Sequence, residues 1–370
     1  MKNLSIAGSQ VTVEKLLQSL IKRCIDFDIS DIHFEPLDSR GRIRFRRDGL
    51  LETVSNLTDD KLQSLISRLK VLSGLDITES RKVQEGVLRW QPSWDRKRDC
   101  EFRVSIIPTV RGEKAVLRRL IGEEKLMKLT ELGFREENEF LLEKMIASNQ
   151  GIIFVCGPTG SGKTTTLFAC LDRIRREEIN IITLEDPVEI YLEGVSQIQV
   201  NSEEGGSFAE KLRAGLRQDP DIIMVGEIRD IETARMAVRA ALTGHLVLTT
   251  IHTFDALGTI IRLREMGIPS YLTAETLLGI VSQRLLRKTC GECEGKGCEV
   301  CFDSGFRGRT AIQEVIYIDR IYQQAIMNSH DRKKLENIRE KKETCTLLED
   351  GCQKAEAGLV EIEEVERVLR

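Results

Sequence analysis

Residues 151–165 read GIIFVCGPTGSGKTT, an apolar run that leads into a glycine-rich turn. Such a run, at residues 152–156, is typical of a strand buried on both faces of a parallel sheet. The turn matches the P-loop pattern of spaced glycines, a lysine and a hydroxyl. Its residues are Gly157, Pro158, Thr159, Gly160, Ser161, Gly162, Lys163 and Thr164. The stretch therefore predicts an α/β domain with a phosphate-binding loop before its helix.

A nucleoside triphosphate is the ligand that this loop predicts. Phosphate oxygens need several donors at once, and consecutive backbone N–H groups beside a helix amino terminus supply them. We expect the Lys163 ammonium to reach the β and γ phosphates and the Thr164 hydroxyl to bind Mg²⁺, with Thr165 also in the nucleotide site. ATP and Mg²⁺ are the expected cofactors.

Acidic side chains follow two of the three later apolar runs, which are residues 181–184, 222–225 and 246–251. Gly226 stands where a Walker B aspartate is usual, so Glu227 is the sole acid there, and we expect it to activate water. We expect Glu185 and Asp186 to support Mg²⁺ and the γ-phosphate end. The alternative is that these acids only stabilise helix starts, a reading that suits Glu189.

His245 and His252 flank the run 246–251 in a chain with only 4 His. A seven-residue gap would put the two imidazoles on opposite faces of an ideal strand, so a shared metal is not expected. We expect one or both to hydrogen-bond near the γ-phosphate and report the nucleotide state. The alternative is a structural role.

Four of the 10 Cys form two CxxC pairs only four residues apart, at Cys290, Cys293, Cys298 and Cys301. Four thiolates at this spacing can close a tetrahedral Zn²⁺ site. An iron–sulfur cluster is the less favoured alternative. With sulfur at all four positions no place remains for a substrate, so we expect a structural metal that pins a hairpin.

The composition is that of a globular chain with no general attraction for nucleic acid. The chain has 370 residues, of which 41% are hydrophobic and 31% charged, with a net charge of −4. Its length suits roughly two to three domains. No apolar stretch is long enough to cross a bilayer and no signal peptide is evident, so an intracellular protein is expected.

The pattern changes near residue 121, which predicts two α/β domains. The smaller, 1–121, should contain a helix over 13–25, a hairpin turning at Asp48–Gly49, a helix over 60–73 and a hairpin over 100–120. A linker is expected at 122–130, and a larger domain at 131–370. From about residue 256 we expect mainly helices, apart from the cysteine stretch 290–301.

Four consecutive boxes resemble those of the secretion ATPases of type II secretion and type IV pilus machinery. They are GPTGSGKTTT (157–166), TLEDPVE (183–189), DPDIIMVGEIRD (219–230) and TGHLVLTTIHT (243–253). The likeness extends to SDIHFEP (30–36), FRVSIIPTVRGEKAVLRRL (102–120), QRLLR (283–287) and GFRGRTAIQEV (305–315). It spans nearly the whole chain, and the order and spacing of the boxes make it specific.

The resemblance implies a PAS-like amino-terminal domain, a RecA-like P-loop domain with a helical carboxy-terminal part, and a homo-hexameric ring. It implies that Arg103 and Arg118 meet the phosphates and stabilise the charge that develops on them; the alternative is two solvated charges on a strand face. The cysteine knuckle is typical of the branch that assembles pilins or pseudopilins. The implied partner is an inner-membrane platform protein, which would hold a cytoplasmic enzyme at the inner face of the membrane.

A different class shares the RecA-like core, namely nucleic-acid translocases and helicases. Such a protein needs a basic channel that carries aromatic side chains. Aromatic residues are only 5% here and the net charge is negative. The stripe of Arg42, Arg44 and Arg46 is the only local support, so a nucleic-acid partner is not expected.

Overall fold

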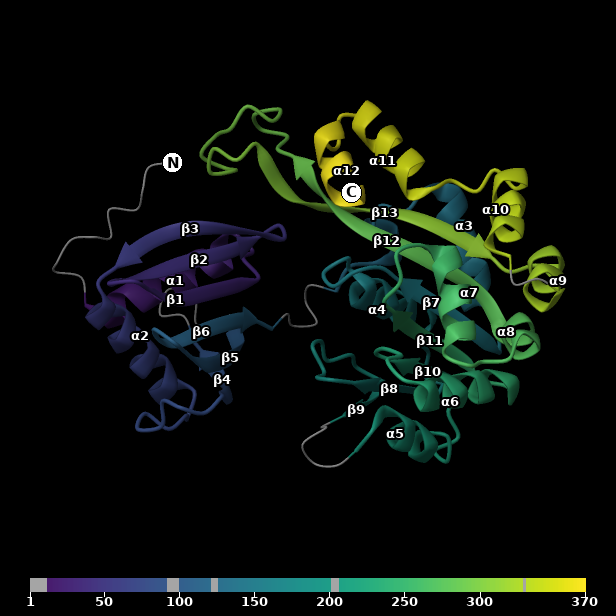
Figure 1. Ribbon diagram of the computed structural model, residues 1–370, viewed down its shortest axis with the longest axis horizontal. Helices are drawn as coiled ribbons and strands as arrows, with labels where there is room; N and C mark the ends of the chain where they lie inside the picture. The colour runs from purple at the N-terminus through teal and green to yellow at the C-terminus, as the bar shows by residue number, and fades with distance from the viewer. Residues whose placement is uncertain (1–11, 92–99, 121–125, 201–205, 329–330) are drawn as a thin grey trace. The chain divides into compact units, whose positions relative to one another are not determined.

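The computed structural model describes residues 12–91, 100–120, 126–200, 206–328 and 331–370, and it divides into two compact units at residues 121 and 122 (Figure 1). Of the expected linker, 122–130, residues 122–125 lie outside the described residues. A single turn of 3-10 helix, η2 (Leu129–Glu131), lies at its end. No helix in the described ranges has the length and apolar character needed to span a bilayer.

The first unit is a six-stranded antiparallel sheet with two helices packed on one face. The strand order is β3 (Leu50–Leu57), β2 (Arg40–Arg47), β1 (Asp31–Leu37), β6 (Gly112–Arg119), β5 (Cys100–Thr109) and β4 (Gln84–Trp90). The helices are α1 (Val13–Asp26) and α2 (Asp59–Leu72). Both helices and both hairpins expected from the sequence are present, whereas β1 and β4 were not predicted.

The core of this unit follows directly from the apolar spacing of its sequence. On α1 the residues at three- and four-residue spacing are buried, and they pack with those on α2 and the inner face of the sheet. On β1, Ile32 and Phe34 belong to that core. Because side chains alternate along a strand, Asp31, His33 and Glu35 lie on the opposite, helix-free face. This face therefore carries the charged side chains of β1.

The second unit is a seven-stranded sheet with helices on both faces. The strand order is β13 (Phe306–Tyr317), β12 (Leu277–Thr289), β7 (Gly151–Cys156), β11 (Leu246–Ile251), β10 (Ile222–Val225), β8 (Ile181–Glu185) and β9 (Ser196–Gln199). Apart from β13, neighbouring strands are parallel. The four apolar runs predicted as buried strands are β7, β8, β10 and β11, and all are buried. The predicted fold class is confirmed.

The helices of this unit enclose two separate apolar cores. On one face lie α3 (Glu136–Ile146) and α4 (Lys163–Ile174). The other core includes residues of α5 (Phe208–Gly215), α6 (Ile231–Leu242), α7 (Ala256–Glu265), α8 (Ser270–Thr276), α9 (Arg320–Asn328) and α10 (Arg332–Lys341). The chain ends in α11 (Leu347–Glu356) and α12 (Ile362–Leu369), which pack against the β12–β13 hairpin.

The expectation of mainly helices after residue 256 is wrong for 277–289 and 306–317, on either side of the cysteine stretch. These residues form a long antiparallel hairpin, β12 and β13, whose tip carries the cysteine stretch. Short apolar runs within it fit a helix or a strand equally well by periodicity alone. Pairing of β12 with β7, a contact distant in sequence, decides for the strand.

Candidate functional site

The P-loop lies between the carboxyl end of β7 and the start of α4, as the sequence predicts. Pro158, Thr159 and Gly160 are exposed. The Lys163 side chain is buried, and its Nζ donates to the carbonyl oxygens of Gly157 at 2.9 Å and Pro158 at 3.0 Å. Burial lowers the pKa of this ammonium, an effect that the Glu227 carboxylate opposes. The loop thus holds a cation beside a stretch of backbone open to solvent.

Two glycines let the loop approach the neighbouring strand closely, and a serine inside it lacks a hydrogen-bond partner. Gly157 has φ +148° and Gly162 has φ +86°, and a Cβ on either would lie within 2.7 Å of a Gln283 atom. The buried Ser161 hydroxyl has no hydrogen-bond partner among the described residues. A phosphate oxygen would give it one, so the residues present fit a nucleotide.

Gln283 of β12 supports this loop from the neighbouring strand, and sequence reasoning did not identify it. Its Nε2 donates to the Ser161 carbonyl oxygen at 2.7 Å, and its Oε1 accepts from the Thr166 hydroxyl at 2.8 Å. The side chain is buried. The only sequence signal was its place in the family-like stretch QRLLR, which lay in a region expected to be helical.

We expect Gln283→Leu to weaken ATP binding about tenfold, since two buried hydrogen bonds that shape the P-loop are lost. Titration with a fluorescent ATP analogue measures this. Gln313→Leu is a matched control: Gln313 pairs with Gln283 across the hairpin and is equally buried, but its amide donates to Leu132 instead. The control should lose stability and keep its affinity for ATP; equal losses of affinity would contradict the role of Gln283.

Four parallel strands bring the other predicted residues to the same sheet edge. The carboxyl end of β7 leads into the P-loop, and that of the adjacent β11 leads into His252. Next in the sheet, β10 leads into Glu227 and β8 leads into Asp186. Neighbouring strands are about 4.8 Å apart, so the P-loop and Glu227 are separated by roughly 10 Å across the sheet. The site therefore lies along one edge of the sheet, the edge formed by the carboxyl ends of its parallel strands.

Glu227 is held between an arginine and a histidine. Its carboxylate forms an ion pair with Arg229 through one oxygen, and its Oε2 lies 3.5 Å from Nε2 of His252. The Glu227 side chain is 16% exposed, whereas that of His252 is 47% exposed. Sequence reasoning missed Arg229, although it belongs to the box that contains Glu227. The two contacts thereby orient the carboxylate at the carboxyl end of β10.

Glu185 and Asp186 differ in their surroundings. Glu185 is buried at the end of β8, and its Oε1 accepts from the Thr183 hydroxyl at 2.6 Å and from Gln197 Nε2 at 3.0 Å. Burial raises the pKa of this carboxyl, and the two hydrogen bonds act in the opposite direction. Asp186 is exposed and within electrostatic reach of Arg229. Of the two, Asp186 is the more open to solvent.

The structure does not bring His245 to this edge. It precedes β11, and its backbone oxygen accepts from the N–H of Gly151 at the start of β7. Its Nδ1 lies 2.9 Å from the Ala240 carbonyl oxygen. A strand of six residues spans about 20 Å, so the imidazole lies at the edge opposite the P-loop. The prediction that His245 contacts the nucleotide is therefore wrong for this arrangement.

Arg103 and Arg118 are cross-strand neighbours on β5 and β6 of the first unit. Arg103 Nη2 donates to Glu85 at 2.6 Å, and Arg118 Nε donates to Asp31 at 2.8 Å. Their side chains are 40% and 63% exposed. Both guanidinium groups are thus accessible on the helix-free face, each with a carboxylate partner.

The four cysteines of the predicted knuckle converge at the tip of the β12–β13 hairpin. Their sulfur atoms all lie within 4.8 Å of one another. The Sγ–Sγ distances are 3.9 Å for Cys290 and Cys298, 3.7 Å for Cys293 and Cys301, and 3.7 Å for Cys298 and Cys301. Zn–S bonds of about 2.3 Å in a tetrahedron place sulfur atoms about 3.8 Å apart, so the cluster fits zinc.

Backbone donors around the cluster favour thiolates over thiols. The N–H of Gly297 donates to Cys293 Sγ at 3.2 Å, and that of Gly305 donates to Cys301 Sγ at 3.3 Å. The Cys290 N–H donates to the Gly305 carbonyl oxygen, which closes the base of the loop. Charged sulfur is the form that binds a metal.

The parallel sheet, the P-loop and the carboxylate edge define a RecA-like P-loop nucleoside triphosphatase. The sequence matches the family described as type II/IV secretion system protein over residues 7–367. The chain belongs to this family and is an ATPase.

Relatives and one solved structure agree with this membership. Type II secretion system protein E of Aeromonas hydrophila is 39% identical over all of this chain and 78% of that protein. Type IV pilus assembly ATPase PilB of Thermus thermophilus is 40% identical over 95% of this chain and 42% of that protein. The pilus retraction motor PilT, solved with bound ADP, has a TM-score of 0.67 and 29% identity over 95% of this chain and 96% of its own.

Proposed function

We propose that the chain is the subunit of a homo-hexameric motor that hydrolyses ATP to assemble a type IV pilus, a competence pseudopilus or a type II secretion pseudopilus. The main support for this chemistry is that Lys163, Thr164, Glu227 and His252 all lie at the carboxyl ends of the parallel strands of one sheet. The names of the relatives, a type II secretion protein and a pilus assembly ATPase, support the choice of process.

The reaction is ATP and water to ADP and phosphate. Glu227 takes a proton from the attacking water, and its carboxylate is oriented for this by Arg229 and His252. Lys163, already inside the loop, counters the charge on the β and γ phosphates. Preorganised charge of this kind supplies much of the rate enhancement of phosphoryl transfer.

The residues present also fit Mg²⁺. Thr164 is exposed in the first turn of α4 and offers its hydroxyl to the ion, with Asp186 and the buried Glu185 in supporting roles. When bound, Mg²⁺ supplies positive charge to the phosphate oxygens. Binding of the nucleotide itself includes Thr165, the next residue of the same helix.

Arg103 and Arg118 supply further positive charge from the first unit. Each now pairs with a carboxylate, so each can exchange that partner for a phosphate oxygen during the cycle. Charge that comes from a separate unit makes hydrolysis depend on the movement of that unit. Conversion of this movement into displacement of an inner-membrane platform protein would be the work of the motor.

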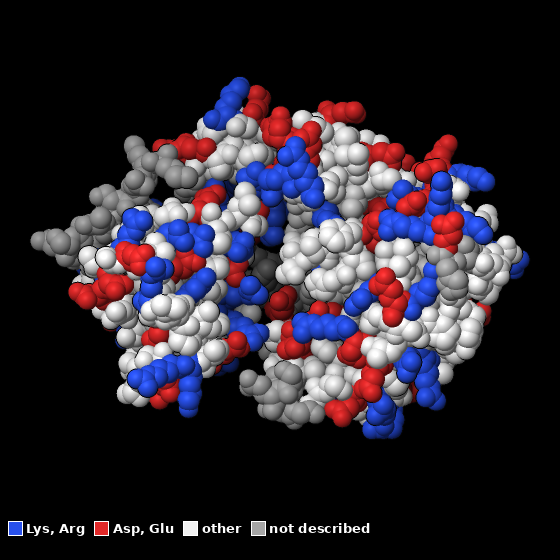
Figure 2. Space-filling model, in the orientation of Figure 1, with Lys and Arg blue, Asp and Glu red and all other residues white. Residues whose placement is uncertain are grey.

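The enzyme is placed by this proposal in the cytoplasm, held at the inner face of the membrane through its partner. The four cysteines bind zinc as a structural ion, which fixes the tip of the hairpin. On the face shown in Figure 2, blue and red side chains are interspersed in each unit. A continuous basic surface, which a nucleic-acid translocase needs, is not visible on that face.

ATP turnover by the purified chain, alone and with added partners, tests this function. Conformational steps and product release often limit the turnover of enzymes that move, and a partner can accelerate them. We therefore expect the cytoplasmic domain of the platform protein to stimulate turnover, whereas single- or double-stranded DNA should not. Lys163→Ala should abolish turnover under all conditions and shows that the activity belongs to this site. Stimulation by DNA alone would contradict the proposal and favour a translocase.

A further inference from the structure

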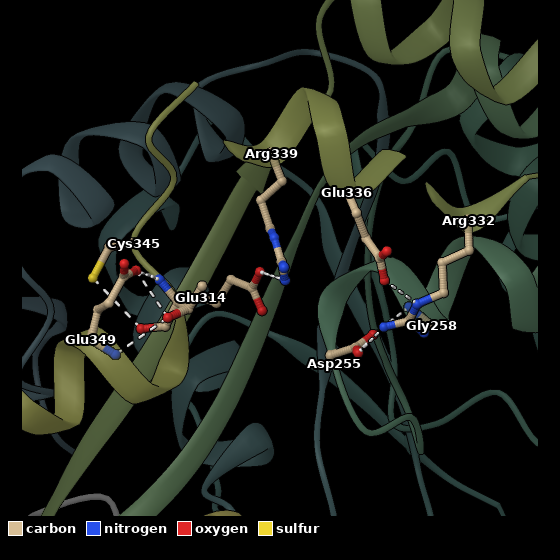
Figure 3. Close-up of polar contacts among 9 residues, drawn as sticks. Asp255, Gly258, Glu314, Arg332, Glu336, Arg339, Cys345 and Glu349 are labelled. Carbon is tan, nitrogen blue, oxygen red and sulfur yellow. Dashed lines mark hydrogen bonds and ion pairs between the residues drawn. The ribbon is translucent and has the colours of Figure 1, made fainter. Parts of the chain in front are cut away.

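The helix α10 is tied to the loop that carries His252. Arg332, its first residue, places Nη2 2.5 Å from Asp255 Oδ2 and Nε 2.7 Å from Glu336 Oε1 (Figure 3). Further along the helix, Arg339 Nη1 donates to Glu314 Oε1 on β13 at 3.2 Å. One helix is thus fastened both to the sheet and to a loop at the sheet edge that forms the site.

Asp255 connects that loop to two helices at once. Its Oδ1 accepts from the Gly258 N–H at 2.6 Å and caps α7, while its Oδ2 accepts from Arg332. Two residues earlier, the Thr253 hydroxyl lies 2.9 Å from that of Thr259 in α7. The carboxylate therefore sets the position of the loop relative to both α7 and α10.

The sheet holds the same loop from the other side. Arg284 Nη2 donates to the carbonyl oxygen of Phe254 at 2.7 Å. Arg284 is buried and follows Gln283, the residue that supports the P-loop. The His252 side chain, by contrast, is half exposed, with its Nε2 3.5 Å from Oε2 of Glu227. Its distance to Glu227 depends on how the loop is held.

We propose that Arg332 is a positioning residue for ATP hydrolysis, because its ion pair with Asp255 holds the loop that presents His252 to Glu227. The proposal rests on the proposed function of Glu227 as the base. Arg332 contacts Asp255 and Glu336, and it acts on the reaction through the loop alone. Since the Arg332 side chain is 43% exposed, its ion pair adds little to the stability of the fold, and its effect should appear in the rate of hydrolysis.

The first test is Arg332→Ala, for which we expect kcat to fall about tenfold while the affinity for a fluorescent ADP analogue changes less than about twofold. Arg332→Lys should recover part of kcat. In a His252→Ala background, Arg332→Ala should cause no further loss, since both changes would remove the same contribution. Asp255→Asn, which keeps an acceptor for the cap of α7 but removes the charge, should match Arg332→Ala.

Lys342→Ala is the matched control. The substitution removes the ion pair between Lys342 Nζ and Asp319 Oδ2, which are 2.5 Å apart, the same distance as in the Arg332–Asp255 pair. Lys342 caps the opposite end of α10, away from the loop. This variant should keep the wild-type kcat. The role of Arg332 would be overturned if Arg332→Ala and Asp255→Asn both kept the wild-type kcat. It would also be overturned if Arg332→Ala lowered kcat equally in the His252→Ala background. Either result would leave the proposed function of the chain intact. A wild-type chain without ATP turnover would overturn the proposed function as well.

Discussion

Glu227→Gln is expected to lower ATP turnover about 10²- to 10⁴-fold while ATP binding is retained. Glutamine keeps the shape of the side chain and can still contact Arg229 and His252, but it cannot accept a proton from water at neutral pH. Single-turnover hydrolysis measures the rate, and equilibrium binding of a fluorescent ATP analogue measures the affinity. The variant should therefore bind ATP and fail to cleave it.

The matched control is Glu189→Gln, which changes the same residue type in the loop after β8. Glu189 is exposed, and we assign it no part in the reaction. The Glu189→Gln protein should hydrolyse ATP at the wild-type rate. Near-normal turnover in Glu227→Gln would show that another group accepts the proton, and the assignment of the base would have to be abandoned.

Loss of the metal from the cysteine knuckle should have the second large effect. Protein purified without chelators should contain one zinc ion per chain, and Cys293→Ser should lose it. Because metal binding supplies much of the folding free energy of such small loops, residues 290–305 should unfold locally. Elemental analysis gives the zinc content, and hydrogen exchange of the hairpin tip gives the local stability.

Cys352→Ser serves as the control for that experiment. Cys352 is half-buried on α11 and stands outside the cluster. The zinc content of the Cys352→Ser protein should equal that of the wild type. Wild-type protein with no bound zinc, or with iron and sulfide in its place, would disprove the structural zinc site.

Much of the catalytic edge could be predicted because its parts are local. The P-loop from Gly157 to Thr164 is one contiguous stretch whose residues act together. Glu227 and His252 each come directly after a buried apolar run, and carboxyl ends of parallel strands meet at one edge. The two CxxC pairs likewise require only short-range spacing. In each case the chemistry is encoded within about a dozen residues.

What the sequence determined by itself, then, was the phosphate loop, the acids at the strand ends, the cysteine cluster and the two-domain order. Only the tertiary structure decided that 277–289 and 306–317 are paired strands, that Gln283 supports the P-loop and that Arg332 pairs with Asp255. The structure also placed His245 at the amino end of β11, away from the P-loop. These features arise from pairing between residues far apart in the chain, and no periodicity within one segment records which distant strand will lie beside it.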